Sequence, residues 1–126
     1  MDGQSDHHCP GCGTALKSNP RYPWYFCNDC RERAEDCEGR RLVFGNAAVS
    51  GGLSWRYADM PSLRDDGALR VLCLISGRPA VVSEARFGGV VAQPLTGDHG
   101  PAGQDHTVDL TRPHTLHKAR KRLIQA

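Results

Sequence analysis

The sequence predicts a mainly β protein that carries a cysteine-bearing unit near its N-terminus and a short helix at its C-terminus. The 126 residues include 14 glycines and 8 prolines, a content that favours short strands and turns over long helices. Short apolar runs and segments of alternating apolar and polar residues fill the stretch 41–95, and such alternation is typical of half-buried strands. Two closely spaced pairs of cysteines precede this stretch.

These observations divide the chain into four segments. We expect a disordered polar lead, a compact cysteine unit, an antiparallel β-body, and a loop that leads into a basic tail. Their bounds are residues 1–8, 9–33, 41–95 and 96–126. No run of about 18 apolar residues occurs, so no transmembrane helix is expected, and the polar N-terminus lacks the apolar stretch of a secretory signal. We therefore expect a cytoplasmic protein with no membrane partner.

The β-body is predicted to be an antiparallel meander of five short strands joined by tight turns. The strands are expected at residues 42–44, 53–57, 68–75, 80–83 and 87–93. Residues 76–79 have the composition of a tight turn, and Gly88 with Gly89 indicates a bulge or a close approach of backbones. The segment 105–112 is ambiguous and could add an edge strand.

The basic tail has the periodicity of a short helix. Between residues 115 and 124 the apolar side chains Leu116, Ala119, Leu123 and Ile124 recur at helical spacing, which places them on one face. About eleven residues are too few for a stable isolated helix in water, so we expect the helix to form by covering an apolar surface. On this interpretation its basic side chains stay solvated.

The strongest chemical signal is a C-x₂-C-x₁₄-C-x₂-C pattern formed by Cys9, Cys12, Cys27 and Cys30. Two residues between cysteines allow one tight turn to direct both sulfurs at a single ion, and two such turns supply the four thiolates of a closed tetrahedral site. In a cytosolic chain this spacing favours a metal over disulfides. Zn²⁺ is the expected structural ion, and Fe is the alternative because iron also accepts four thiolates.

The segments Cys9-Pro10-Gly11-Cys12-Gly13 and Cys27-Asn28-Asp29-Cys30 resemble the two knuckles of a zinc ribbon. The second knuckle departs from the pattern, because Arg31 stands where many knuckles carry Gly. The resemblance covers residues 9–30 and implies a small β-hairpin module that holds zinc. Zinc ribbons occur in nucleic-acid-binding, protein-binding and purely structural contexts. The whole chain also resembles small bacterial proteins that join an N-terminal ribbon to a β-rich remainder, which implies no particular function.

An aromatic segment between the two cysteine pairs is a candidate binding surface. Arg21, Tyr22 and Tyr25 could stack nucleic-acid bases or hold a peptide. The structural alternative is that Trp24 and Phe26 pack the cysteine unit onto the β-body, because small ribbons lack a core of their own, while the two tyrosines face outward.

The tail is a second candidate binding surface, because charge is distributed unevenly along the chain. All 14 acidic residues lie before residue 111, whereas the tail carries Lys118, Arg120, Lys121 and Arg122. Basic tails often contact nucleic acid or other anionic surfaces. The formal net charge is only +2, which weakens a nucleic-acid interpretation and leaves another protein as the favoured partner.

The sequence contains no known enzyme motif. No P-loop, nucleophile elbow, HExxH or zinc-deaminase pattern occurs, and a four-cysteine site leaves no open position for a catalytic water. Glu84 and Arg86 could position a substrate, although an ordinary ion pair is the simpler explanation. Of the remaining cysteines, Cys73 is expected to be buried in a strand and Cys37 to be spare.

We therefore expect a non-enzymatic zinc-binding protein that acts as a protein-interaction module. The alternatives are a nucleic-acid-binding zinc-ribbon protein that uses the basic tail and the aromatic segment, and an enzyme of unrecognised type.

Overall fold

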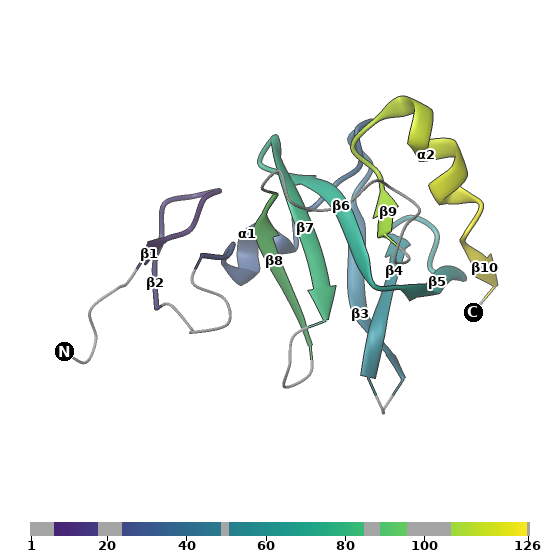
Figure 1. Cartoon of the computed structure of the whole chain (residues 1–126), viewed down its shortest axis with the longest axis horizontal. Coiled ribbons are helices and arrows are strands. Elements are labelled where there is room, and N and C mark those ends of the chain that lie inside the picture. Colours follow the sequence, from purple (N-terminus) through teal and green to yellow (C-terminus); the bar gives the residue numbers. More distant parts are fainter. Residues whose placement is uncertain (1–6, 18–23, 49–50, 85–88, 96–106, 126) are drawn as a thin grey trace.

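The computed structural model describes residues 7–17, 24–48, 51–84, 89–95 and 107–125. The described elements are mostly strands, which form two four-stranded sheets and one two-stranded ribbon, with a short helix near the C-terminus (Figure 1). The predicted fold class is therefore confirmed. None of the helices in the described ranges is long and apolar enough to cross a membrane.

The first sheet has the strand order β10-β5-β4-β3. Its strands are β3 (Leu42–Ala48), β4 (Gly51–Tyr57), β5 (Leu63–Ala68) and β10 (Ile124–Gln125). The alternation read from the sequence places Leu53, Trp55 and Tyr57 on the buried face of β4, as a period of two requires. All neighbouring strands in this sheet are antiparallel.

The second sheet has the strand order β8-β7-β6-β9. Its strands are β6 (Arg70–Ile75), β7 (Arg78–Glu84), β8 (Val90–Pro94) and β9 (Thr107–Asp109). The turn between β6 and β7 consists of Ser76 and Gly77, whose φ angles are 53° and 77°, a conformation that matches the right-handed twist of the flanking strands. The ambiguous segment supplies the edge strand β9, which runs parallel to β6.

The strand expected over 68–75 is found as β6 over Arg70–Ile75, but it belongs to a second sheet, so the prediction of one meander was wrong. The chain leaves the first sheet at Ala68 and enters the second at Arg70, with Leu69 exposed between them. Strand β5 was not predicted, because two acidic residues interrupt its apolar pattern. The β-body therefore consists of two sheets and not a single meander. Apolar side chains of both sheets join in one core.

The N-terminal unit consists of β1 (His7–His8), β2 (Ala15–Leu16) and the single-turn helix α1 (Asn28–Arg31). We expected a disordered lead over residues 1–8, but His7 and His8 pair with β2, and residues 1–6 lie outside the described ranges. The hairpin β1–β2 lies at one end of the molecule and α1 lies beside the second sheet (Figure 1).

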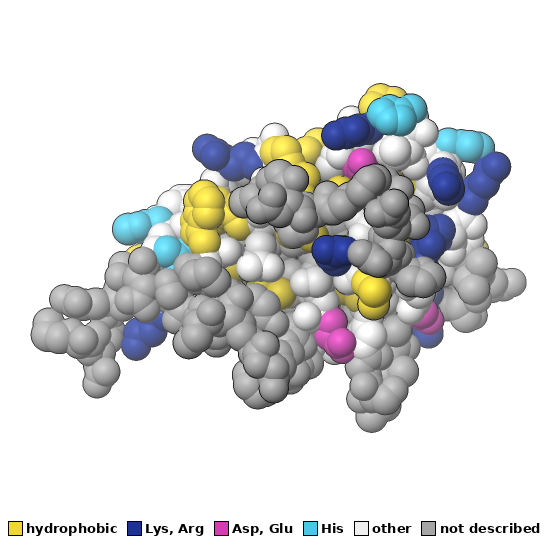
Figure 2. Space-filling model, viewed as in Figure 1, with side chains coloured by type: hydrophobic (Ala, Val, Ile, Leu, Met, Phe, Trp, Pro, Cys, Tyr) yellow, Lys and Arg dark blue, Asp and Glu magenta, His cyan; other side chains and the backbone are white. Residues whose placement is uncertain are grey.

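The C-terminal helix α2 spans Pro113–Arg120, so it begins and ends earlier than predicted. Proline fits the first turn of a helix, where its missing N–H has no intrahelical partner. Leu116 and Ala119 are buried in the core and Leu123 packs against it, which confirms a docked helix. Lys, Arg and His side chains gather over α2 (Figure 2). The expected helical residue Ile124 instead begins β10.

Candidate metal centre

The four cysteines of the predicted site lie together. Cys9 follows β1, Cys12 ends the first tight turn, Cys27 precedes α1, and Cys30 lies within α1. All four Sγ atoms lie within 4.8 Å of one another, and the Sγ atoms of Cys12 and Cys27 are 3.6 Å apart. The sequence spacing therefore predicted a real cluster.

The cluster has the dimensions that a tetrahedral metal ion requires. Four thiolates at metal–sulfur distances of about 2.3 Å form a tetrahedron with edges of about 3.8 Å. This edge is close to the 3.6 Å between the Sγ atoms of Cys12 and Cys27 and within the 4.8 Å limit on all the separations. All four cysteines are free thiols. The residues present thus fit a metal ion with four sulfur ligands.

Backbone groups support the sulfur of Cys9. The amides of Gly11 and Cys27 donate to its Sγ at 3.4 and 3.2 Å, and such donors stabilise thiolate charge. Gly11 is required on steric grounds, because an added Cβ would lie 2.9 Å from the Sγ of Cys30. Gly13 adopts a φ of 81°, in the left-handed region that favours glycine. The two glycines therefore shape the first knuckle.

The thiols differ in acidity. Burial raises the pKa of Cys9, but hydrogen bonds from backbone amides, first that of Cys27, outweigh burial and leave this pKa below its ordinary value. The hydroxyl of Thr14 is the main cause that lowers the pKa of Cys12 to about 6. Burial raises the pKa of Cys27 and raises the pKa of Cys30 to about 12. Because metal ligands must be thiolates, metal binding releases the protons that these thiols still carry.

The second knuckle is bonded to an edge of the second sheet. The amide of Phe26 donates to the carbonyl of Ala92 at 2.8 Å, and the guanidinium of Arg31 donates to the carbonyl of Val90 at 3.0 Å. Cys9, Phe26 and Cys30 belong to the same buried core as the two sheets. The cysteine-bearing segment is thus continuous with the β-body.

The aromatic segment only partly follows its predictions. Phe26 is buried as expected, whereas Trp24 is 48% exposed and does not pack the unit onto the β-body. Its indole nitrogen donates to the carbonyl of His8 at 3.1 Å. The Tyr25 ring lies edge-on to that of His7. The candidate residues Arg21 and Tyr22 lie outside the described ranges.

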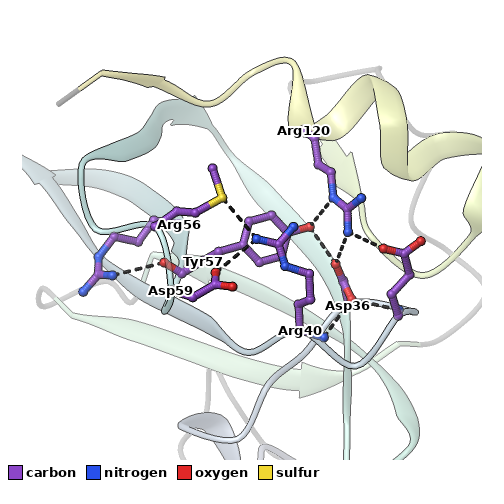
Figure 3. Close-up of polar contacts among 8 residues, drawn as sticks. Asp36, Arg40, Arg56, Tyr57, Asp59 and Arg120 are labelled. Carbon is purple, nitrogen blue, oxygen red and sulfur yellow. Dashed lines mark hydrogen bonds and ion pairs between the residues drawn. The ribbon is translucent and has the colours of Figure 1, made fainter.

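Two of the four tail cations do not stay solvated, which corrects that expectation. Arg120 lies 3.1 Å from the fully buried carboxylate of Asp36, whose other donors include the hydroxyl of Tyr57 at 2.7 Å (Figure 3). Burial raises the pKa of Asp36, but the hydrogen bonds, first that of Tyr57, outweigh it and hold this pKa below its ordinary value. Arg40 lies over the Tyr57 ring at 4.0 Å.

Arg122 forms the second internal ion pair. Its Nε lies 2.6 Å from the buried carboxylate of Asp65, which also accepts the indole N–H of Trp55 at 2.8 Å. Lys118 and Lys121 remain exposed. Sequence reasoning missed both networks, because the acids and their arginines are far apart in the chain and share no motif.

The other candidates show no site. The Glu84 carboxylate accepts from the amide of Gly52 and the side chain of Asn46, while Arg86 lies outside the described ranges. Cys73 is fully buried as predicted, and Cys37 is half-buried.

Comparisons with protein-family models, curated proteins and solved structures found no match to this chain. The assignment of a function therefore rests on the chemistry of the residues.

Proposed function

We propose that this protein is a non-enzymatic, zinc-stabilised module that binds another protein. The observation that carries the proposal is the cluster of four thiols joined to the core of the β-body. A site with four protein ligands has no open position for a substrate or a catalytic water, so its contribution is to folding.

Zinc is the proposed ion because this site has the features of a structural centre. The metal would be held by Cys9, Cys12, Cys27 and Cys30, and it would supply charge neutralisation to four thiolates. Iron fits the same ligands, but zinc carries no redox chemistry and suits a purely structural function.

A non-enzymatic function is supported by the remaining polar clusters. The carboxylates of Asp36 and Asp65 are buried and bonded to arginines, so within the described residues they act as internal anchors for the C-terminal segment. Such fully partnered carboxylates are structural in character, because their hydrogen-bonding capacity is taken up within the fold.

Protein binding is favoured over nucleic-acid binding by the fate of the tail cations. Two of the four candidate side chains neutralise internal carboxylates, which leaves less positive charge for phosphates than the sequence suggested. The indole of Trp24 is exposed and held by a hydrogen bond, and such pre-ordered aromatic side chains commonly anchor protein interfaces.

The test compares Cys27→Ser with Cys37→Ser, since both cysteines are half-buried but only Cys27 belongs to the cluster. We expect about one zinc per chain in the native protein and in Cys37→Ser, and a sharp loss in Cys27→Ser. Metal content is measured by elemental analysis, and iron would be revealed by its visible absorption. Full zinc occupancy in Cys27→Ser would contradict the metal assignment.

Cross-linking of the zinc-loaded native chain in lysate of its host, followed by mass spectrometry, tests the partner class. We expect a defined set of proteins whose capture survives nuclease treatment and is reduced for Cys27→Ser. Capture that nuclease abolishes would contradict a protein partner.

A further inference from the structure

Strand β3 forms one edge of the first sheet (Figure 1). Among the described strands it pairs with β4 alone. An edge strand presents backbone donors and acceptors that another chain can use. Which groups are presented can be read from the hydrogen bonds at the beginning of β3.

The backbone N–H and C=O groups of successive residues along β3 point alternately toward β4 and away from it. Ala58 donates to the carbonyl of Arg41 at 2.9 Å, so residue 41 points its backbone groups toward the chain of β4. Leu42 donates to the carbonyl of Ala34 at 2.9 Å, on the opposite side. In an antiparallel pair this alternation continues with a period of two. The N–H and C=O groups of Phe44 and Asn46 therefore point away from β4.

Beside this edge lies a groove with a volume of about 390 Å³. It is lined by residues of α1, by the beginning of β3 and by Ala58 after β4. Val43 is 37% exposed and Phe44 is half-buried, so the groove offers apolar surface next to the outward-pointing backbone groups of Phe44. This combination fits an extended chain better than a compact ligand.

The charged side chains around the groove indicate the composition of the peptide that would bind there. Arg31 and Arg41 both line it, and within the described residues neither guanidinium forms an ion pair with a carboxylate. Glu32 is the single acidic residue in its lining. Because Arg31 also donates to the carbonyl of Val90, Arg41 is the guanidinium that complements a carboxylate on the bound segment, since Arg binds carboxylates through paired N–H donors.

We propose that β3 binds an extended peptide segment of a partner protein by strand addition. The segment bonds to the backbone groups of Phe44 and Asn46, packs a β-branched side chain beside Val43, and directs an acidic side chain at Arg41. This inference rests on the proposed protein-binding function and specifies the partner's chemistry and the surface that it occupies.

The free edge is tested first in the protein alone. Amide hydrogen exchange measured by NMR resolves single residues of β3. We expect the amides of Phe44 and Asn46 to exchange at least about tenfold faster than those of Val43 and Gly45, which point toward β4. Equal protection of all four amides would overturn the assignment of a free edge.

The binding test uses a displayed library of random octapeptides with the full zinc-loaded chain as the target. Asn46→Pro removes one outward N–H without removing a backbone hydrogen bond to β4. Asn46→Ala keeps that N–H and loses the same side-chain bonds to Gly52, Glu84 and Gly89, so it is the matched control. We expect selected peptides to be acidic and rich in β-branched residues, to bind Asn46→Pro and Arg41→Glu about tenfold more weakly, and to bind Asn46→Ala within about twofold of the native chain.

Each remaining outcome overturns the proposal. Peptides that bind Asn46→Pro and the native chain equally would place the contact elsewhere and leave the protein-binding function intact. An empty selection would exclude an extended peptide as the ligand, whereas the cross-linking experiment still tests for a folded partner. Self-association in sedimentation that Asn46→Pro abolishes would identify the occupant as a second copy of the chain.

Discussion

At the scale of single residues, Arg120 does more than its place in a basic tail suggests. It pairs with a carboxylate that has no exposed surface, and it also donates to the hydroxyl of Tyr57. Removing one partner of a buried ion pair leaves the other charge uncompensated, which costs more than the pair itself contributes. We therefore expect Arg120 to contribute to the stability of the fold, although it lies on an otherwise exposed basic helix.

Arg120→Ala should lower the free energy of unfolding at pH 7 by about 3 kcal/mol. Lys121→Ala is the matched control, because Lys121 is the exposed neighbour, and it should change this free energy by less than about 0.5 kcal/mol. Urea unfolding of both variants provides the measurement. Indistinguishable midpoints would show that the Arg120–Asp36 contact contributes nothing to stability.

The same pair predicts the pH dependence of that difference. The pKa of Asp36 in the folded protein lies below its ordinary value of 3.8, so the stabilisation is present above pH 3.8 and is lost as the pH falls through the lowered value. The difference in the free energy of unfolding between the native protein and Arg120→Ala should therefore become smaller as the pH falls below 3.8.

At the scale of elements, the second knuckle joins the metal centre to β8. Phe26 contributes a buried side chain and a backbone hydrogen bond to Ala92, and α1 places Cys30 in the core. A segment of this size cannot bury enough apolar surface to fold alone. We therefore expect the order of this segment to depend on both a bound ion and the sheet.

Chelation of the metal should destabilise the whole protein and not a detached unit. We expect one cooperative thermal transition, measured by circular dichroism and calorimetry, which moves to lower temperature in chelator and returns when zinc is restored. Two transitions, of which the second ignores the chelator, would show that the knuckles and the β-body fold independently.

At the scale of the whole molecule, two of the basic side chains near the C-terminus form ion pairs with buried carboxylates. The C-terminal segment crosses from the second sheet to the first, since α2 follows β9 and β10 pairs with β5. Arg120 and Arg122 fasten this crossing to Asp36 and Asp65. Of the four tail cations, Lys118 and Lys121 remain exposed over this segment.

This distribution predicts weak binding to nucleic acid. In gel-shift measurements at two salt concentrations, the native chain should bind duplex and single-stranded probes only at low salt, with a shallow salt slope. A double variant, Lys118→Glu with Lys121→Glu, keeps both internal ion pairs and serves as the control. Tight, strongly salt-dependent binding that this variant loses would favour the nucleic-acid alternative.

The cysteine cluster and most strands could be predicted from the sequence because their signals are local. Two cysteines separated by two residues need only one turn to converge, and alternation along residues 53–57 reports the buried face of one strand. The docked apolar face of α2 was predicted for the same reason, because Leu116 and Ala119 lie one turn apart. In each case the informative residues are neighbours in the chain.

Only the tertiary structure decided how these parts combine. It divided residues 63–75 between two sheets, exposed Trp24, and brought Arg120 to a carboxylate 84 positions away in the chain. Side chains at such separations carry no pattern that one sequence reveals, because their pairing depends on how the sheets pack. The sequence by itself therefore determined the cysteine cluster and the strand content, whereas packing determined which charged side chains became internal.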